Sequence, residues 1–416
     1  MVNERRTPEV RFDGFYGNWT ERFLGDVLEI WSAARVHKDE WTTEGVPFFR
    51  SSDIMSAILG KDNVKAFISE DLFNALSAIS GKVKKDDVLV TGGGSIAMPY
   101  LVPNDDPLYF KDGDLLLLRD KTKENVLGQF LYYFFISPSL RRYVASITHI
   151  GTISHYTIEQ AKTTTAFLPD VEEQAFIGNF FRNLDDTIAL KKQQYEQTVN
   201  IKKSMLEKMF PQKGADVPEI RLEGFRGAWE RHKLGDVAVF SKGSGYSKAD
   251  LEQSGTPIIL YGRLYTKYET VIDDVDTYAT LKDGSIISQG GEVIVPSSGE
   301  TAEDIARASV VVQSGVILGG DLNIVKANIS IDPIFLTLTI SNGTPQRELS
   351  KKAQGKSVVH IRNSDLQELE FITPDIKEQA AIGNFFRNLD TLIETQREEL
   401  EKLQNIKKAC LSKMFV

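Results

Sequence analysis

The chain contains one sequence module twice, and this duplication constrains its fold more than any other feature. Residues 8–27 match residues 218–237 at an offset of 210, and both stretches end in Leu-Gly-Asp-Val. Residues 171–210 match residues 376–415 at an offset of 205, and 22 of these 40 positions are identical. Two copies of one module in one polypeptide predict an internal two-fold, and therefore a target that itself has two parts.

The duplication continues through the diverged middle of each copy. The offset is 210 at Pro47 and Pro257 and has become 205 at Asp87 and Glu292, so the first copy carries a net insertion of five residues between residues 54 and 88. Later matches keep the offset of 205, apart from a local slip near residue 114. The whole chain is therefore interpreted as a tandem repeat of about 205 residues.

Length and composition are those of an ordinary water-soluble protein with two lobes. The 416 residues are enough for two or three domains, and 41% are hydrophobic and 26% charged. We find no apolar run near 20 residues and no charged-then-apolar leader, which predicts a cytoplasmic protein that neither spans a membrane nor is secreted by a standard signal. A single cysteine, Cys410, excludes an internal disulfide and a cysteine-based zinc site, and suits a reducing compartment.

The charge balance gives no direct indication of a nucleic-acid partner. The formal net charge is −9, from 58 acidic and 49 basic side chains, whereas phosphate binding favours Lys and Arg. Net charge describes the long-range field and not a local patch. Residues 342–362 carry five basic side chains against one acidic side chain, Glu348, so a dipolar surface is compatible with the composition.

The first part of each copy, residues 8–170 and 218–372, is expected to be a strand-rich α+β lobe. Short apolar runs separated by Gly, Asp and Ser predict strands near residues 87–91, 113–118, 285–288 and 292–295. Residues 126–136 and 333–340 predict helices, and the strand order does not follow from the sequence. We divide the chain into an N-terminal lobe (1–170), a central helix (171–210), a linker (211–217), a C-terminal lobe (218–372) and a C-terminal helix (373–416).

The second part of each copy is predicted to be one long amphipathic helix. Apolar residues recur at steps of three and four, forming a seam that includes Ile177, Phe181, Leu184, Ile188, Tyr195, Val199 and Leu206 in one copy, and Ile382, Phe386, Leu389, Ile393, Leu400, Leu403, Ile406 and Cys410 in the other. About 40 residues give a rod on the order of 55–60 Å. The internal two-fold predicts antiparallel packing of the two seams. On this interpretation Lys191, Lys192, Lys202 and Lys203 are solvated. Without the duplication, the same stretch would indicate only a dimerising coiled coil.

These features together resemble the specificity subunits of type I restriction–modification systems. The matching motifs are the alternation of lobe and helix, the lobe opening Gly-x-Trp-x-x-x-x-Leu-Gly-Asp-Val at Gly17 and Gly227, the helix start Pro-Asp-(Val/Ile)-x-Glu-Gln-x-x-Ile-Gly-Asn-Phe-Phe-Arg-Asn-Leu-Asp at Pro169 and Pro374, and the helix end Ile-Lys-Lys-x-x-Leu-x-Lys-Met-Phe at Ile201 and Ile406. The resemblance covers the whole chain, and each motif occurs twice.

The resemblance implies a DNA-recognition subunit that is not itself an enzyme. Each lobe would read one half of a bipartite double-stranded DNA site, and the helices would act as spacer and as docking site for two methyltransferase subunits that methylate adenine N6. Restriction and translocase subunits would join them. S-adenosylmethionine, ATP and Mg²⁺ are expected in those partners, and no cofactor is expected in this chain. The alternatives are an orphan specificity subunit with no nuclease partner and a coiled-coil scaffold that binds proteins.

Catalytic signatures are absent from the sequence. The Gly-Lys-Ser at residues 355–357 lacks the earlier glycine of a phosphate-binding loop, because Ser350 occupies that position. Neither a zinc-ligand cluster nor a Gly-x-Ser-x-Gly elbow occurs. The Asn-Pro-Pro-Tyr/Phe motif of an adenine methyltransferase is also missing, which disfavours a methyltransferase in its own right.

Comparing the two copies separates scaffold from candidate DNA-reading positions. Matched residues such as Trp19/Trp229 are interpreted as scaffold, whereas the loop after the central strand differs in chemistry: Thr91, Gly92, Gly93, Gly94 and Ser95 against Ser297, Ser298, Glu300 and Thr301. Small residues allow close approach to DNA, and a Glu could accept from cytosine N4. A second candidate place is Arg50 and Ser51 in copy one against Tyr261, Arg263, Tyr265 and Lys267 in copy two, where Arg263 is a candidate guanine reader.

The third candidate region is the basic approach to each helix. It comprises Arg141, Arg142, Tyr143 and Thr152 in copy one, and Arg347, Lys351, Lys352 and Lys356 in copy two. The matched Arg142/Arg347 pair is interpreted as a phosphate clamp shared by both lobes. The matched His155/His360 pair is interpreted as a structural cap where a strand leads into a helix. Inserting helix residues is expected to change the spacer between half-sites and not the half-sites themselves.

Overall fold

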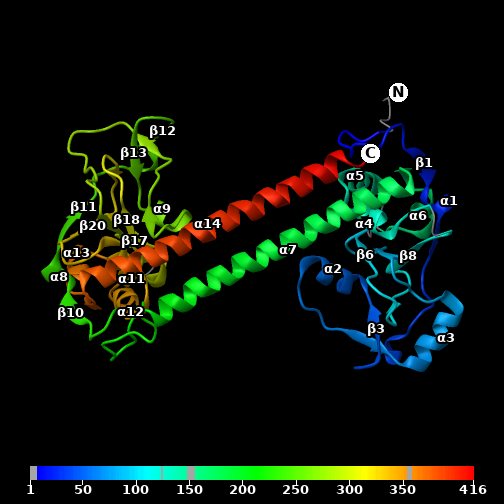
Figure 1. The fold of residues 1–416 in the computed structure, drawn as a ribbon, viewed down its shortest axis with the longest axis horizontal. Coiled ribbons are helices and arrows are strands. Elements are labelled where there is room, and N and C mark those ends of the chain that lie inside the picture. The colour runs from blue at the N-terminus through cyan, green and yellow to red at the C-terminus, as the bar shows by residue number, and fades with distance from the viewer. Residues whose placement is uncertain (1–6, 123–124, 148–154, 354–357) are drawn as a thin grey trace. The chain divides into compact units, whose positions relative to one another are not determined.

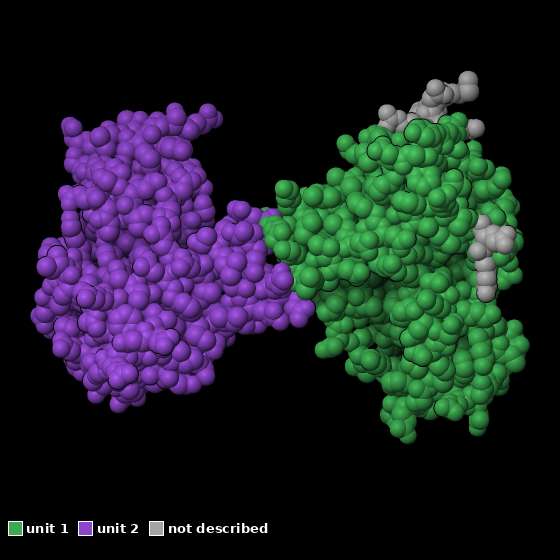
Figure 2. Space-filling model, in the orientation of Figure 1, with its two compact units in different colours: residues 1–191, 399–416 green, residues 192–398 purple. Residues whose placement is uncertain are grey.

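The computed structural model describes residues 7–122, 125–147, 155–353 and 358–416 (Figure 1). These residues form two compact units (Figure 2). Unit 1 comprises residues 1–191 and 399–416, and unit 2 comprises residues 192–398. The boundary between the units falls within the two long helices, so each unit contains one lobe and a part of both helices. No helix of the described residues is long and apolar enough to cross a membrane.

The lobe of unit 1 mixes short strands and helices, as its apolar runs predict. Its central sheet is antiparallel in the order β2-β8-β5-β6, and smaller sheets have the orders β4-β3-β7 and β1-β9. The elements are β1 (Thr20–Phe23), α1 (Leu24–Val27), β2 (Leu28–Trp31), β3 (Val46–Phe49), α2 (Ser51–Leu59), β4 (Ala66–Ile68), α3 (Glu70–Ser80), β5 (Val88–Thr91), β6 (Pro99–Leu101), β7 (Tyr109–Phe110), β8 (Leu115–Asp120), α4 (Gly128–Ile136), α5 (Pro138–Ile147), α6 (Ile158–Thr163) and β9 (Thr165–Leu168), followed by the helix α7 (Val171–Lys208).

The lobe of unit 2 repeats this frame. Its main sheet has the order β11-β20-β16-β18-β14, and smaller sheets have the orders β12-β15-β13-β19, β10-β22 and β17-β21. The elements are β10 (Glu230–Lys233), α8 (Leu234–Val237), β11 (Ala238–Lys242), β12 (Leu251–Glu252), β13 (Thr256–Ile259), α9 (Arg263–Thr266), β14 (Val271–Ile272), β15 (Tyr278–Ala279), β16 (Glu292–Pro296), β17 (Ser298–Gly299), α10 (Ala302–Ile305), β18 (Ser309–Val311), β19 (Ile317–Leu318), β20 (Leu322–Ala327), α11 (Pro333–Ser341), α12 (Gly343–Lys352), β21 (Val359–His360), α13 (Asn363–Gln367), β22 (Glu370–Thr373) and α14 (Ile376–Lys413).

The central strand of each lobe is buried on both faces. In β5, Val88 and Val90 face a core that includes α4, while Leu89 faces a second core beneath β3 and α3. In β16, Val293 and Ile294 divide in the same way between two cores. This explains the continuous β-branched runs at these positions, because alternate residues of a strand point to opposite faces and here neither face meets water.

One predicted strand is not formed. Residues 285–288 make only an isolated bridge, from Ile287 to Ile317. Ser285 instead closes a turn, where its hydroxyl donates to the Lys282 carbonyl at 2.6 Å and contacts the Tyr246 hydroxyl at 2.5 Å. The prediction was wrong because the two isoleucines are partly exposed and cover the edge of a small sheet, which a short apolar run does not distinguish from a core strand.

The long helices run antiparallel within each unit. In unit 1, Lys191 of α7 pairs with Glu399 of α14 at 2.9 Å. Asp185, earlier in α7, pairs with Lys407, later in α14, at 2.5 Å, as antiparallel helices require. In unit 2, Lys202 forms an ion pair with Asp390. These contacts confirm the predicted antiparallel packing of the helices. Together with the two similar strand-rich lobes they confirm the predicted fold.

The seam itself differs in detail from its prediction. Ile177, Phe181, Ile382 and Phe386 are buried. Most of the remaining seam residues are half-buried: Leu184, Ile188, Tyr195, Leu206, Leu389, Ile393, Leu400, Leu403 and Cys410. Val199 and Ile406 are exposed, while Thr198 is buried and Lys202 is half-buried. The side of α7 that faces the partner helix therefore includes residues 198, 202 and 205 and not residue 199, because alternating steps of four and three keep one side in contact. Lys202 and Lys191 are thus paired, and only Lys192 and Lys203 are solvated as predicted.

Each lobe holds the end of the helix that belongs to the other copy. Phe415, after the last turn of α14, packs against Phe130 and Phe181 of unit 1 at ring distances of 5.4 and 5.9 Å. Phe210, after α7, packs against Phe335 and Phe386 of unit 2 at 5.5 and 6.2 Å. The repeated Lys-Met-Phe ending is therefore a buried anchor, and it occurs twice because each lobe provides one aromatic socket.

Each helix start is fixed by a second repeated device. The guanidinium of Arg11 donates to the fully buried carboxylate of Glu173 at 2.6 and 2.7 Å, and Arg221 does the same to Glu378 at 2.6 Å. These charges are acceptable inside the protein because each carboxylate receives two hydrogen bonds from a geometrically matched fork. The matched arginines thus tie the opening segment of each lobe to the first turn of its helix.

Candidate nucleic-acid interface

The loop after the central strand of unit 1 has a buried base and an exposed tip. In this first loop (residues 91–98), the Thr91 hydroxyl accepts from the Met98 amide at 2.8 Å and donates to the Ser95 carbonyl. A Cβ at Gly92 would meet the carbonyl oxygens of Gly113 and Tyr156 at 3.2 Å, so a larger residue would push this closely packed backbone apart. Thr91, Gly92 and Gly93 are buried, which leaves Gly94 and Ser95 as the predicted readers that face solvent.

The equivalent loop of unit 2 has the same design with different chemistry. In this second loop (residues 296–301), Ser297 and Ser298 are buried, and the Ser297 hydroxyl accepts from Lys242 at 2.6 Å. Burial lowers the pKa of Lys242. Thr301 caps α10 by accepting from the Asp304 amide at 3.0 Å. Glu300 is exposed at the tip, so a carboxylate stands in unit 2 near where unit 1 presents glycine and serine.

The two histidines lie beside these loops in both units. His155 forms an antiparallel bridge with Gly93, and His360 pairs antiparallel with Ser298. Both histidines are exposed, and neither caps the following helix, because Thr157 and Arg362 occupy the N-cap positions of α6 and α13. The interpretation of these residues as caps was therefore wrong. They extend the solvent-facing surface of each loop. The sequence did not predict this proximity, because each histidine is about 60 residues from the loop that it pairs with.

The basic residues divide into internal supports and surface charges. Arg141 of α5 donates to the carbonyls of Ile96 and Ala97 at 2.9 and 2.8 Å, so it holds the first loop. Burial lowers the pKa of Arg141. Arg142 and Arg347 occupy equivalent exposed positions on α5 and α12, as a shared phosphate contact requires.

The remaining basic-approach residues are mostly engaged or lie outside the described structure. Tyr143 packs half-buried on the core of unit 1. Lys351 pairs with Glu348 at 2.9 Å, and Lys352 donates to the Asp365 carbonyl at 3.4 Å. Thr152 and Lys356 fall outside the described residues. Arg142 and Arg347 are therefore the positions on which a phosphate-contact hypothesis can be tested.

The second candidate place proves to be largely internal support. Arg50 pairs with Asp53 at 2.8 Å and donates to the Val64 carbonyl at 2.5 Å, and the Ser51 hydroxyl donates to the Asp114 carbonyl at 3.1 Å. These bonds fix the start of α2. They leave little of the Arg50 guanidinium available for DNA.

Arg263 lies inside unit 2, with 8% of its side chain exposed, and its guanidinium binds Asp276 at 2.6 Å and Glu269 at 2.8 Å. The hydrogen bond from Arg263 lowers the pKa of Asp276. As placed, Arg263 has no free edge for guanine. Tyr265 donates to the Ser298 carbonyl at 2.8 Å and so supports the second loop; Lys267 lies near Asp276 at 3.5 Å, and Tyr261 is exposed.

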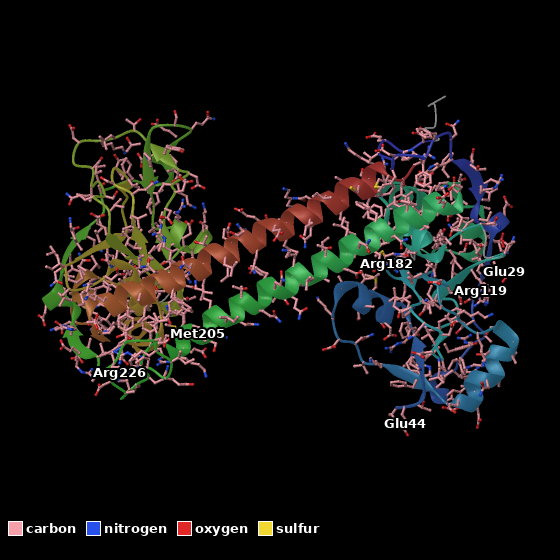
Figure 3. All side chains as sticks on the ribbon, in the orientation of Figure 1. Glu29, Glu44, Arg119, Arg182, Met205 and Arg226 are labelled. Atoms are coloured by element: carbon pink, nitrogen blue, oxygen red, sulfur yellow. The ribbon has the colours of Figure 1, made fainter. Side chains whose placement is uncertain are left out.

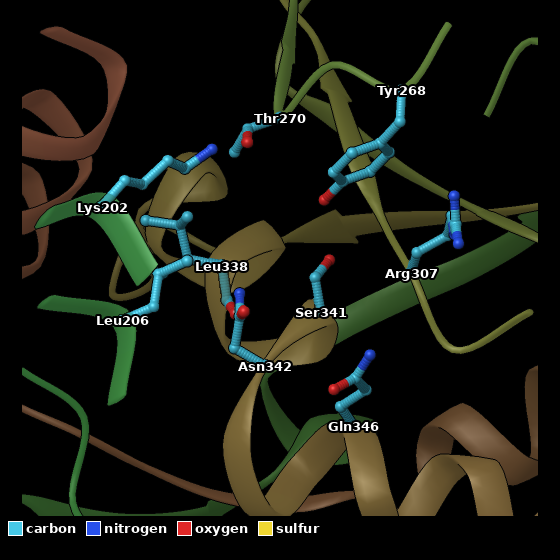
Figure 4. Close-up of a pocket in the computed structure, with 9 residues that line it drawn as sticks. All are labelled: Lys202, Leu206, Tyr268, Thr270, Arg307, Leu338, Ser341, Asn342 and Gln346. Carbon is cyan, nitrogen blue, oxygen red and sulfur yellow. The ribbon is translucent and has the colours of Figure 1, made fainter. Parts of the chain in front are cut away.

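A residue that the sequence did not single out, Arg307, joins this support. Its guanidinium lies over the rings of Tyr265 and Tyr268, 5.4 Å from each centroid, and forms an ion pair with Asp304. It borders a cavity of about 180 Å³ (Figure 4). The lining residues are Lys202, Leu206, Tyr268, Thr270, Arg307, Leu338, Ser341, Asn342 and Gln346. The spacing of three residues between Asp304 and Arg307 was the feature of the sequence that could have predicted this ion pair.

Part of the repeated sequence is exposed in both units. Asn179, Phe180 and Asn183 form a solvent-facing strip on α7, and Asn384, Phe385 and Asn388 form the same strip on α14; the asparagines are exposed and the phenylalanines half-buried. We call these two strips the repeated face. Arg182, labelled on α7 in Figure 3, donates to the Asn179 side chain at 3.2 Å. Packing within a lobe explains the two half-buried phenylalanines but not the identical exposed asparagines, so the repeated face is a candidate site for one partner bound twice.

Comparison with known proteins agrees with this arrangement. A family model described as the type I restriction modification DNA specificity domain matches residues 16–200 and again residues 227–405. The chain is 23% identical over 351 residues to the type I restriction enzyme MjaVIII specificity subunit of Methanocaldococcus jannaschii, covering 79% of this chain and 78% of that protein. A putative MjaX specificity subunit of the same organism is 23% identical over 442 residues, covering 95% and 92%.

Solved structures show the same fold. The crystal structure of the specificity subunit of a type I restriction–modification system from M. genitalium superimposes with a TM-score of 0.63 at 17% identity and covers 99% of both chains. A structure described in terms of complex assembly and conformational transition of the type I restriction–modification system gives a TM-score of 0.50 at 16% identity, covering 94% and 96%.

Proposed function

This chain belongs to the family of type I restriction–modification DNA specificity proteins, and we propose that it is the DNA sequence-specificity subunit of such a complex. The lobe of unit 1 reads one half of a bipartite DNA target and the lobe of unit 2 reads the other half. The helices α7 and α14 set the gap between the halves. The chain serves recognition, and the methylation and cleavage chemistry belongs to its partners.

One observation carries this proposal. Two lobes of the same frame present different side chains at the same place, next to a histidine that is matched in both lobes. Gly94 and Ser95 stand at the tip of the first loop, and Glu300 stands at the tip of the second. A carboxylate accepts from cytosine N4, whereas a glycine and a serine allow close approach and hydroxyl contacts. Two lobes that share a backbone fold but carry different side chains at their loop tips are suited to recognise two different half-sites.

The repeated face gives the proposal its partners. Its two strips carry the same side chains in both units, so they suit two identical methyltransferase subunits and not two different sequences of DNA. These subunits transfer the methyl group of S-adenosylmethionine to adenine N6. Restriction and translocase subunits that use ATP and Mg²⁺ complete the complex. A net charge of −9 on this chain also calls for partners that supply much of the phosphate contact.

The test is methylation mapping by single-molecule sequencing, in cells that contain the partner methyltransferase with or without this chain. The expected result is an N6-methyladenine motif with two defined halves and an undefined gap, which disappears when the chain is deleted. An active methyltransferase whose motif is unchanged by the deletion would instead favour a protein-interaction scaffold.

A single substitution sharpens the assignment of the lobes. Glu300→Gln removes the carboxylate at the tip of the second loop and is expected to alter the bases in one half of the motif only. Glu303→Gln, a nearby exposed glutamate on α10, is the matched control and should leave the motif unchanged. A change in both halves for Glu300→Gln would contradict the independence of the two lobes.

A further inference from the structure

The surroundings of the repeated face differ between the two units. In unit 1, Phe176 is 52% exposed and Tyr16 is 85% exposed. Phe176 contacts the ring of Phe12 at 6.1 Å and that of Phe15 at 5.3 Å. Phe12 also contacts Phe180 of the repeated face at 5.6 Å. These residues form one partly exposed aromatic surface, which we call the aromatic patch: Phe12, Phe15, Tyr16 and Phe176.

Unit 2 has the same frame without most of these rings. The positions equivalent to Phe12, Tyr16 and Phe176 are Leu222, Arg226 and Ala381, and only Phe225 keeps its ring. Arg226 lies in the segment that leads to β10 (Figure 3) and is exposed like its counterpart. The burial pattern of residues 221–229 equals that of residues 11–19, so the backbone frame is unchanged. The extra aromatic surface of unit 1 is therefore not needed to build the fold.

An exposed aromatic surface beside a repeated docking strip indicates additional contact with whatever binds that strip. Aromatic side chains contribute large apolar areas, and they are enriched at the centres of protein interfaces. The patch touches the repeated face directly through the contact between Phe12 and Phe180. A partner that covers Asn179, Phe180 and Asn183 would therefore also meet Phe176, whereas on unit 2 the same partner would meet Ala381.

We propose that the two methyltransferase docking sites are unequal, and that the first methyltransferase subunit binds unit 1 through the aromatic patch. This inference rests on the proposed function, because it takes the methyltransferase as the partner of the repeated face. Assembly is then ordered. A complex with one methyltransferase on unit 1 forms first, and unit 2 is filled at higher concentration. Covering one additional phenylalanine side chain strengthens binding by roughly ten- to hundred-fold.

The experiment is a titration of the full-length chain with its cognate methyltransferase subunit, followed by native mass spectrometry. The cognate subunit is the one that produces the bipartite motif in the mapping experiment above. Wild type is expected to bind one subunit at least ten-fold more tightly than the second. Phe176→Ala is expected to weaken the tight step by ten-fold or more and to leave the weak step in place. Ala381→Phe is expected to strengthen the weak step.

Controls separate this inference from folding defects and from other occupants of the patch. Ile79→Ala removes an exposed apolar side chain of α3 away from the patch and should change neither step. Melting curves of Phe176→Ala and Ala381→Phe should overlay that of wild type. Ala381→Phe is expected to gain affinity for the methyltransferase, which a misfolded variant could not do.

Equal affinities in wild type, or a weak step that responds to Phe176→Ala, would overturn the ordered assembly while leaving the proposed function intact. Self-association of the chain that is lost in Phe176→Ala would assign the patch to a second copy of the chain and also overturn the inference. A complete lack of methyltransferase binding, together with no bipartite methylation, would remove the proposed function along with it.

Discussion

Replacing Phe415 by alanine should selectively destabilise unit 1. The side chain is 5% exposed and packs against Phe130 and Phe181, both fully buried. A core Phe→Ala substitution costs about 3–5 kcal/mol through lost transfer energy and the cavity that remains. Phe415 follows the last helical turn, where the chain can partly collapse into the cavity, so we expect about 3 kcal/mol. That corresponds to roughly a hundred-fold more frequent opening of the aromatic socket.

Hydrogen exchange with mass spectrometry on the full chain measures this effect unit by unit. Peptides from α4 in unit 1 should lose protection by about two orders of magnitude in Phe415→Ala, while peptides from α11 in unit 2 should be unchanged. Phe210→Ala is the reciprocal variant and should give the opposite pattern. Ile406→Ala, at an exposed position of α14, should cost less than about 1 kcal/mol.

The reasoning fails if Phe415→Ala leaves the exchange of α4 unchanged or accelerates α11 to the same extent. The first result would mean that the helix end is only loosely held by its socket. The second would mean that the two units do not unfold as separate cooperative bodies.

Three further outcomes are expected. Arg263→Ala should lower the stability of unit 2 by roughly 1–3 kcal/mol in denaturant unfolding, since Glu269 and Asp276 lose the guanidinium and keep only the more distant Lys267, and it should leave the methylated motif unchanged. Arg347→Ala should weaken binding to all DNA sequences alike and reduce the salt slope of an anisotropy titration by about one, whereas altered base preference would contradict a phosphate contact. Inserting about seven residues, two helical turns, at the middle of both α7 and α14 should lengthen the gap of the motif while both halves keep their sequence.

The sequence predicts the architecture well because each helix of the repeat occurs in two copies, so the same pattern can be recognised twice. The helices α7 and α14 lie within the predicted ranges, and α4 and α11 begin within two residues of theirs. The antiparallel arrangement followed from the internal two-fold. The strand order did not, because the connections between short strands leave many pairings open, and a partly exposed pair of isoleucines at residues 286–287 resembles a core strand.

The candidate site was predicted less well because residue type does not reveal whether a charge is already neutralised. Arg263 stands in an aromatic and basic stretch, which suggested DNA, yet its partners Glu269 and Asp276 follow within 13 residues. The acid-rich run at residues 273–276 was the available signal. Arg141 also has internal partners that the sequence does not reveal, since the carbonyls of Ile96 and Ala97 lie far away in the chain and carry no sequence signature; its contact with DNA stays a prediction.

Burial divides the residues shared by the two copies into two kinds, and sequence comparison alone cannot make this division. Glu173 and Gln174 are matched and fully buried, with hydrogen bonds that hold the helix start to the lobe, so their repetition is explained by folding. Asn183 and Asn388 are matched and exposed, so folding does not explain their repetition. A partner that binds twice does explain it. By the same logic, an exposed position beside the repeated face that differs between the two copies, such as Phe176 against Ala381, is where we expect one partner to bind the two units with different affinity.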